Sequence, residues 1–132
     1  MRLDPGRVLV AFLLAAAAMA AGAELPTRKS SAASVSIAVT PKSIAPDAKV
    51  WEFAVVFDTH SKDLRDDLMK SAVLVAGTRE SLPLEWQGAP PGGHHRAGVL
   101  KFNAIRPLPE AIELRIVRPG EAAPRSFRWR LR

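Results

Sequence analysis

Strict alternation of apolar and polar residues, repeated in several short segments, is the feature that most constrains how this chain can fold. In the clearest case, residues 50–58, every second side chain is large and apolar: Trp51, Phe53, Val55 and Phe57. Residues 34–40 repeat the alternation with smaller side chains. Because successive side chains of a strand point to opposite faces, this period predicts strands that each bury one face. The aromatic face of residues 50–58 is expected to lie in a core.

Further short segments bring the predicted number of strands to seven. They cover residues 34–40, 50–58, 72–76, 82–86, 99–103, 111–117 and 127–131. Pro83 lies inside one of them and has no N–H to donate, so that strand is expected at a sheet edge. Only residues 63–70 change period, with Leu64 and Leu68 four apart, which predicts one or two helical turns.

Seven short strands with one buried face each predict an all-β domain, an immunoglobulin-like two-sheet sandwich over residues 34–132. A small open barrel is the alternative. The predicted core contains these large side chains: Trp51, Phe53, Phe57, Phe102, Ile112, Leu114, Phe127 and Trp129.

The first residues have the pattern of an export signal. Arg2 and Arg7 precede an apolar run of 14 residues, 8–21, and the small residues 21–23 follow. This order predicts a signal peptide, residues 1–23, with cleavage after Ala23. An uncleaved anchor is the alternative, although the run is shorter than the roughly 20 residues that span a bilayer. The polar residues 24–33 are expected to form a flexible leader.

Composition limits the compartment and the chemistry. The chain has no cysteine, which excludes disulfides and thiolate sites, and its 19 Lys and Arg against 13 Asp and Glu give a net charge of +6. Export without disulfides favours a bacterial envelope, so we expect a periplasmic or secreted protein. Export also argues against nucleic acid as a partner. Membrane contact is expected only through an uncleaved signal peptide.

Two pairs of residues could bind a metal ion. His94 and His95 lie in a loop rich in Gly and Pro, residues 87–97, while Asp58 and His60 share one face at the end of a strand. If the two loops meet, these four residues could supply ligands for Cu(II) or Zn(II). In the alternative interpretation, the histidines bond to loop carbonyls and the other pair caps the strand.

No catalytic constellation is apparent. Residues 58–61 contain an acid, a histidine and a serine, but neighbours on an extended chain do not form a triad. Asp66 and Asp67 would point about 100° apart on a helix, and we expect them on a solvated face. No glycine-rich phosphate loop follows a strand. The sequence therefore predicts no enzyme, no catalytic residue and no organic cofactor.

The final predicted strand has a basic outer side. Its outward positions carry Arg128, Arg130 and Arg132, and Arg115 faces outward from the strand before it. If the two strands pair, they form a cationic ladder that could meet anionic lipid, an acidic polymer or an acidic protein. The alternative is a solvated surface whose charge protects an edge strand.

One resemblance rests on residues 55–61 and 86–102, which include the segment GGHHRxGVLxF, and a second rests on the sandwich architecture and the pair Asp58 and His60. This pattern resembles small exported bacterial domains with no assigned activity. The chain is also similar to periplasmic copper-binding sandwiches of the copper-resistance type, which bind copper through an N-terminal histidine with further Asp and His residues. It departs from them because the predicted mature chain begins at Glu24.

These observations favour a non-enzymatic exported module that binds an envelope protein or an anionic surface. The runner-up is a periplasmic copper- or zinc-binding protein that uses Asp58, His60, His94 and His95.

Overall fold

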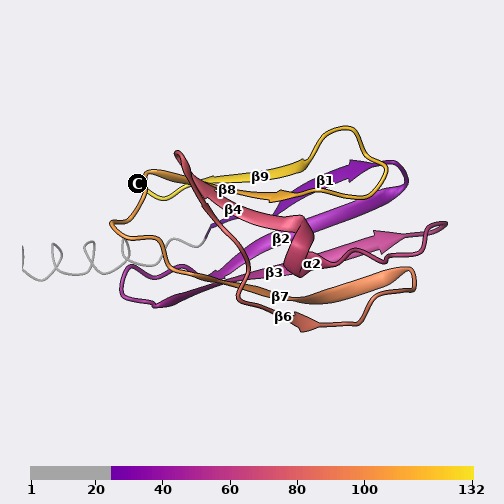
Figure 1. The fold of residues 1–132 in the computed structure, drawn as a ribbon, viewed down its shortest axis with the longest axis horizontal. Helices are drawn as coiled ribbons and strands as arrows, with labels where there is room; N and C mark the ends of the chain where they lie inside the picture. Colours follow the sequence, from indigo (N-terminus) through magenta and orange to yellow (C-terminus); the bar gives the residue numbers. More distant parts are fainter. Residues whose placement is uncertain (1–24) are drawn as a thin grey trace, which may run out of the picture.

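The structure is a computed structural model that describes residues 25–132, so the predicted signal peptide and its cleavage site lie outside the described part. Within residues 25–132, the segments of alternating polarity form strands, and one α-helix has four residues (Figure 1). The elements are β1 (Arg28–Ala32), β2 (Val35–Ser43), β3 (Val50–Thr59), α2 (Leu68–Ser71), β4 (Ala72–Ala76), β5 (Arg79–Ser81), β6 (Glu85–Gly88), β7 (His95–Asn103), β8 (Ala111–Ile116) and β9 (Arg125–Arg130).

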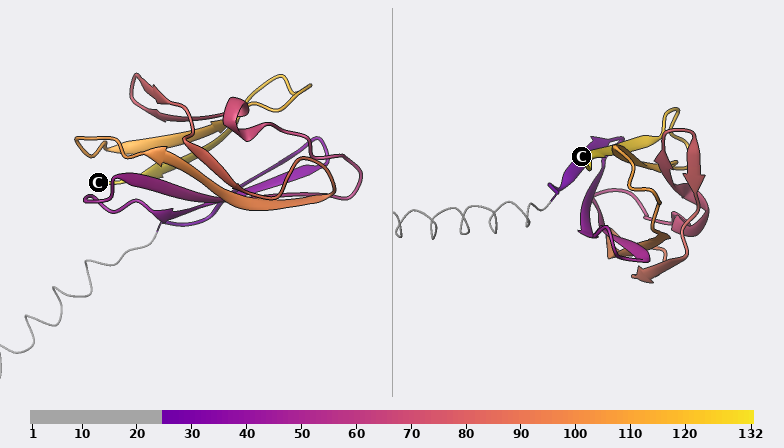
Figure 2. Two further views of the ribbon diagram at one scale, coloured as in Figure 1. Left: turned by 60° about the horizontal axis from the view of Figure 1, so that its bottom comes forward. Right: turned by 90° about the vertical axis from the view of Figure 1, so that its left-hand side faces the viewer.

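The strands form two antiparallel sheets. One sheet has five strands in the order β1-β2-β3-β7-β6, and the other has four in the order β5-β4-β8-β9. The sheets face each other across one apolar core, as the two views in Figure 2 show. The prediction of an all-β fold is therefore confirmed in its coarse form, with two more strands than expected.

The core follows the alternation that the sequence shows. All eight side chains predicted for it are at most 2% exposed. Phe53 lies at the centre of the core, with its ring centroid 5.8 Å from those of both Phe102 and Trp129. Leu64, Leu68 and Ile105 also reach the core, from segments outside the strands. The loops are thus anchored to the same core as the sheets.

Residues 24–33, expected to be flexible, instead contain β1. This strand pairs with β2 in the register Arg28↔Val39 to Ala32↔Val35. Trp129 donates from Nε1 to the carbonyl of Pro26 at 2.7 Å, which fixes the start of the segment from the far end of the chain. The local pattern of Ser and Ala contains no sign of this contact.

The structure does not contain the single strand predicted over residues 82–86. The chain crosses from one sheet to the other at this point: β5 ends at Ser81 in the four-stranded sheet, and β6 begins at Glu85 in the five-stranded sheet. Pro83 lies in the crossing, between two edge strands. Leu82 and Leu84 are consequently 69% and 48% exposed, whereas the alternation placed them inside.

Of the helical turns predicted over residues 63–70, the structure contains only the four-residue helix α2, Leu68–Ser71. The helix begins after Asp67, whose side chain accepts a hydrogen bond from Met69 N as an N-cap. Between residues 25 and 132, no helix has the length and apolarity to cross a membrane.

Candidate functional site

Four connections gather at one end of the two sheets. They are residues 33–34 between β1 and β2, 60–67 after β3, 89–94 before β7 and 117–124 between β8 and β9, and we call them together the loop end. Thr59 N donates to His94 O at 2.9 Å, and Leu64 N to Gly93 O at 3.0 Å. The loop after β3 and the loop before β7 therefore lie side by side, as the metal hypothesis requires.

Arg96 holds these two loops together from the inside. Its guanidinium is buried and donates to the carbonyls of Asp66 at 2.7 Å, Leu64 at 3.4 Å and Ala89 at 3.3 Å. It also stacks on Trp86, with its Cζ 5.7 Å from the ring centroid. Burial lowers the pKa of Arg96. One cation thus satisfies carbonyls from both loops.

Two glycines make room for Trp86 in this arrangement. Gly88 and Gly98 face each other across β6 and β7, and the indole of Trp86 covers both. A Cβ on either residue would come within 2.7 Å of that ring and of the opposite backbone. Part of the glycine content of residues 87–97 therefore serves this packing.

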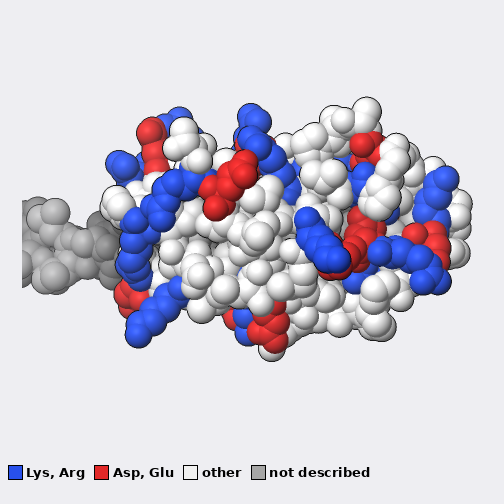
Figure 3. All heavy atoms as spheres, viewed as in Figure 1, with Lys and Arg blue, Asp and Glu red and all other residues white. Residues whose placement is uncertain are grey.

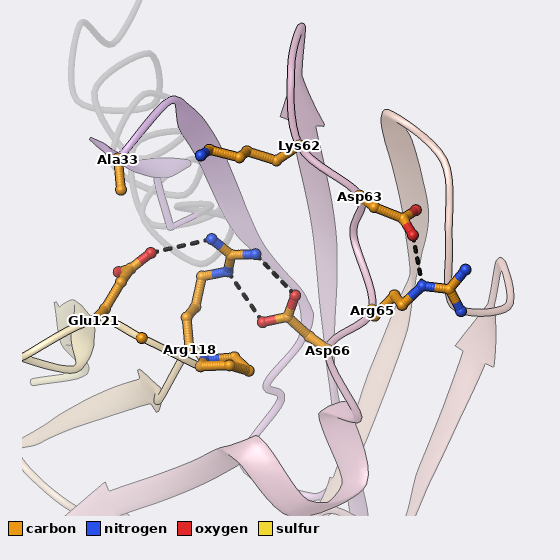
Figure 4. A pocket seen from close by; sticks show the side chains of 9 residues that line it. Ala33, Lys62, Asp63, Arg65, Asp66, Arg118 and Glu121 are labelled. Carbon is orange, nitrogen blue, oxygen red and sulfur yellow. Dashed lines mark hydrogen bonds and ion pairs between the residues drawn. The ribbon is translucent and has the colours of Figure 1, made fainter.

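A second buried cluster links the loop after β3 to the β8–β9 loop (Figure 4). Arg118 donates from Nε and Nη2 to the two oxygens of Asp66, both at 3.0 Å, and from Nη1 to Glu121 at 3.0 Å. Arg125 donates to the two oxygens of Glu121 at 2.7 and 3.0 Å. These four side chains are between 1% and 13% exposed. Two cations and two anions thus balance one another with little exposure to water.

The charges of this cluster shift the ionisation of its members. The guanidinium of Arg125, followed by that of Arg118, holds the pKa of Glu121 below its ordinary value of 4.5, although burial acts in the opposite direction. Burial would lower the pKa of Arg118, but the carboxylates of Asp66 and Glu121 outweigh it and raise that pKa. Both groups are therefore held in their charged forms.

Arg125 also fixes the turn between β1 and β2. Its guanidinium donates to the carbonyls of Ser30 at 3.1 Å, Ala32 at 2.9 Å and Val35 at 3.2 Å. The two turn residues have positive φ, 47° at Ala33 and 64° at Ser34. A residue with a Cβ costs about 1–2 kcal/mol in this region. The contacts of Arg125 hold the turn in spite of that strain.

The four residues predicted to bind metal do not all meet. His95 Nδ1 lies 2.6 Å from Asp58 Oδ1, on neighbouring strands and exposed to solvent. His60 and His94 are exposed at the loop end. Within residues 25–132, no three His, Asp or Glu side chains are close enough to share a metal ion. The structure therefore brings together one acid and one histidine, and metal binding stays a prediction.

Asp66 is the main correction to the predicted surface. It was expected on a solvated helix face, yet it precedes α2, is 2% exposed and pairs with Arg118. The sequence does contain a sign of the buried arginines. Arg96 and Arg125 occupy positions that alternate in phase with the buried side chains of β7 and β9, where an arginine must find internal partners.

The predicted cationic ladder does face outward, but glutamates neutralise part of it. Arg128 lies 3.3 Å from Glu113, and Arg130 lies 3.2 Å from Glu110. Arg115 also pairs with Glu113, at 2.9 Å, and this hydrogen bond is the main cause that holds the pKa of Glu113 below its ordinary value. The outer face of β8 and β9 is therefore one of mixed charge.

No protein-family model, curated protein or solved structure matches this chain. The role of the loop end therefore has to be inferred from its own residues. Its described part combines exposed histidines and charged side chains with an interior that three arginines hold in place.

Proposed function

We propose that this protein is a non-enzymatic binding module of the bacterial envelope, periplasmic or secreted, and that the loop end is its binding surface. One observation supports this most: the buried Arg96 and Arg125, together with Arg118, whose side chain is 10% exposed, fix four separate connections to one another. Loops ordered before binding lose less conformational entropy when a partner docks. Binding residues are also found most often on loops that a rigid scaffold positions.

The order of the strands supports an immunoglobulin-like form of the sandwich. In such domains strands A, B, E and D form one sheet, and C and its neighbours F and G the other. The orders β2-β3-β7-β6 and β4-β8-β9 follow this scheme, with β1 and β5 as added edge strands. The loop end would then carry the B–C and F–G loops, which bind antigen in variable domains.

Export is part of the proposal and rests on residues 1–23. The expected purified form begins at Glu24, which intact-mass spectrometry of the protein from envelope fractions can measure. A form that keeps Met1 and fractionates with the inner membrane would show that residues 1–23 are an uncleaved anchor.

Affinity capture from envelope extracts tests the binding surface. In the loop-end variant, Pro91→Asp and His94→Asp add two acidic groups at exposed positions. The matched control, Val50→Asp with Asn103→Asp, adds the same charge at the other end of paired strands. A partner captured by wild type and control but lost from the loop-end variant supports the proposal. Equal capture by both variants contradicts it.

The second candidate function is periplasmic binding of copper or zinc. The contact between Asp58 and His95, and the closeness of the loops that carry His60 and His94, favour it. Isothermal titration with Cu(II) and Zn(II) is expected to show binding that weakens in acid, because protonated imidazole cannot ligate. Equal heats from a His94→Ala/His95→Ala variant, or no heat at all, would show that His94 and His95 do not bind the metal.

A further inference from the structure

The turn between β1 and β2 has a backbone conformation that its residues do not favour. Ala33 and Ser34 have positive φ, 47° and 64°, and they alone separate the paired residues Ala32 and Val35. A two-residue turn of this kind needs positive φ at both positions, and Asn-Gly is its usual sequence because both residues adopt that conformation readily. Both side chains of the turn are exposed, so packing does not explain their presence. The closed turn is therefore under strain.

The strand before this turn contributes little to the core. None of the five side chains of β1 is buried, and of residues 25–32 only Leu25 packs against the core. β1 is held instead by its ladder with β2 and by hydrogen bonds from Arg125 and Trp129 to its carbonyls and to that of Pro26. An edge strand attached in this way can leave β2 while the two sheets stay packed.

The edge of β2 that β1 covers is specific for the sequence of β1. Without β1, alternate N–H and C=O groups of β2 have no partner, and such an edge readily accepts another strand. Side chains add to the match: Thr27 Oγ1 lies 2.6 Å from Thr40 Oγ1, and Ser31 Oγ lies 2.9 Å from Ser36 Oγ. A second copy of this chain carries the same strand, so its β1 can replace every one of these contacts.

The register of the two strands also suits a pair of identical chains. The pairs run from Arg28↔Val39 to Ala32↔Val35 without a bulge, so the next pair in the same register is Ala33 with Ser34. Within one chain these two residues are neighbours and form the turn. In two chains with extended turns, Ala33 of each can pair with Ser34 of the other about a two-fold axis. The ladder would then keep all its pairs and gain two.

We propose that two copies of this protein exchange β1, so that β1 of each chain pairs with β2 of the other. The closed monomer and the exchanged dimer share their other contacts, and they differ at the turn, where the dimer allows Ala33 and Ser34 to be extended. Short turns under strain favour such exchange. Each left-handed residue disfavours the closed form roughly five- to thirtyfold, and each chain has two of them. This gain offsets the entropy that association costs.

A pair of cysteines tests the exchange directly, because the native chain has none. In the variant Ser31→Cys/Ser36→Cys, the sulfurs replace two oxygens that lie 2.9 Å apart across β1 and β2. The purified protein is concentrated, warmed until its dimer fraction no longer changes, and then oxidised. A closed monomer forms its disulfide within one chain. An exchanged dimer forms two disulfides between chains, which a non-reducing denaturing gel shows as a covalent dimer.

Variants of the turn test its strain as the cause, with size-exclusion chromatography and light scattering as the measurement. Ala33→Asn/Ser34→Gly supplies the favoured turn sequence and should raise the dimer dissociation constant by about 100-fold or more. Ala33→Val puts a β-branched residue at positive φ and should lower that constant by about tenfold or more. The matched control, Ala45→Val, changes an exposed alanine without positive φ in the turn after β2 and should stay within about twofold.

Three results would overturn the inference. The first is a monomer at millimolar concentration for both the wild type and Ala33→Val. The second is a dimer that the Asn-Gly variant leaves unchanged, because strain in the turn would then not drive it. The third is a dimer whose disulfides all lie within single chains, which would assign self-association to another surface. The proposed binding function is tested separately, since capture from extracts at the loop end does not require exchange of β1.

Discussion

The two ends of the molecule both use arginine to hold loops, but they place it differently. At the loop end, the side chains of Arg118 and Arg125 are only 10% and 4% exposed and pair with carboxylates. At the opposite end, Arg106 is exposed and donates to the carbonyls of Pro46 and Ala48, and Arg79 donates to the carbonyl of Arg106 at 3.0 Å. Figure 3 shows charged side chains of both signs along that whole face, from one end to the other. Their number therefore does not distinguish the ends, whereas their burial does.

Burial decides how much each arrangement contributes to stability. An exposed ion pair or hydrogen bond contributes up to about 1 kcal/mol, because water replaces it readily. Breaking one partner of a buried pair costs about 3–5 kcal/mol, since the other charge is left without compensation. A chain that needed only closed loops could use the exposed form at both ends. The buried form adds rigidity, which a binding surface can use.

The largest expected effect follows from removing one charge of the buried cluster. Asp66→Asn keeps the shape of the side chain but leaves Arg118, 10% exposed, with reduced compensation. We expect the free energy of unfolding in urea to fall by about 3 kcal/mol. The double variant Asp66→Leu/Arg118→Met removes both charges and should recover most of that loss. A single variant within about 1 kcal/mol of wild type would mean that burial does not distinguish the two ends.

The sequence predicted the core of both ends but not the polar interior of one. Alternation is local, so it was sufficient to identify Phe53 and Phe127 as buried. The partners of the buried arginines are distant: Asp66 is 30 residues from Arg96, and Ala32 is 93 residues from Arg125. A pattern of neighbours cannot show which carbonyls will surround a cation, because the fold has to exist first.

For the candidate site, too, the sequence indicated residue types but not the contacts between distant residues. Asp58 and His95 were both selected for their residue types, and the pairing of β3 with β7 puts them opposite each other. The link was not visible because the sequence pattern paired Asp58 with His60, two residues away on the same strand.

A second prediction concerns how the stability that Glu121 contributes at the loop end depends on pH. The pKa of Glu121 is lower in the folded protein than its ordinary value of 4.5, so the folded state binds a proton there less readily than the unfolded state. The stabilisation is complete above about pH 4.5 and is lost as the pH falls through the folded-state pKa. Glu121→Gln should therefore be less stable than wild type at pH 7, and the difference should shrink as the pH falls below about 4.5 and through the folded-state pKa. An unchanged difference between pH 7 and pH 3, measured by urea unfolding, would contradict this reading of the cluster.

A third, smaller effect concerns the strained turn of the loop end. Ala33→Gly removes a Cβ from a residue with φ of 47°, so it should raise the free energy of unfolding by about 0.5–1 kcal/mol after the entropy of the unfolded chain is included. The matched change Ala32→Gly lies in β1 and should lower stability by a similar amount. Equal losses from both variants would show that the turn is not strained.

The smallest expected effect lies at the opposite end, and it isolates burial as the cause. Arg106→Ala deletes hydrogen bonds to two carbonyls of the turn between β2 and β3, but both the side chain and that turn are exposed to water. Water can satisfy the freed carbonyls, so the free energy of unfolding should fall by less than about 1 kcal/mol. Arg118→Ala deletes a similar number of bonds, yet it leaves Asp66 as a buried anion and should cost several times more. If urea unfolding gave equal losses for the two variants, the hydrogen bonds themselves would account for both ends, and the buried cluster would lose its special role in ordering the binding surface.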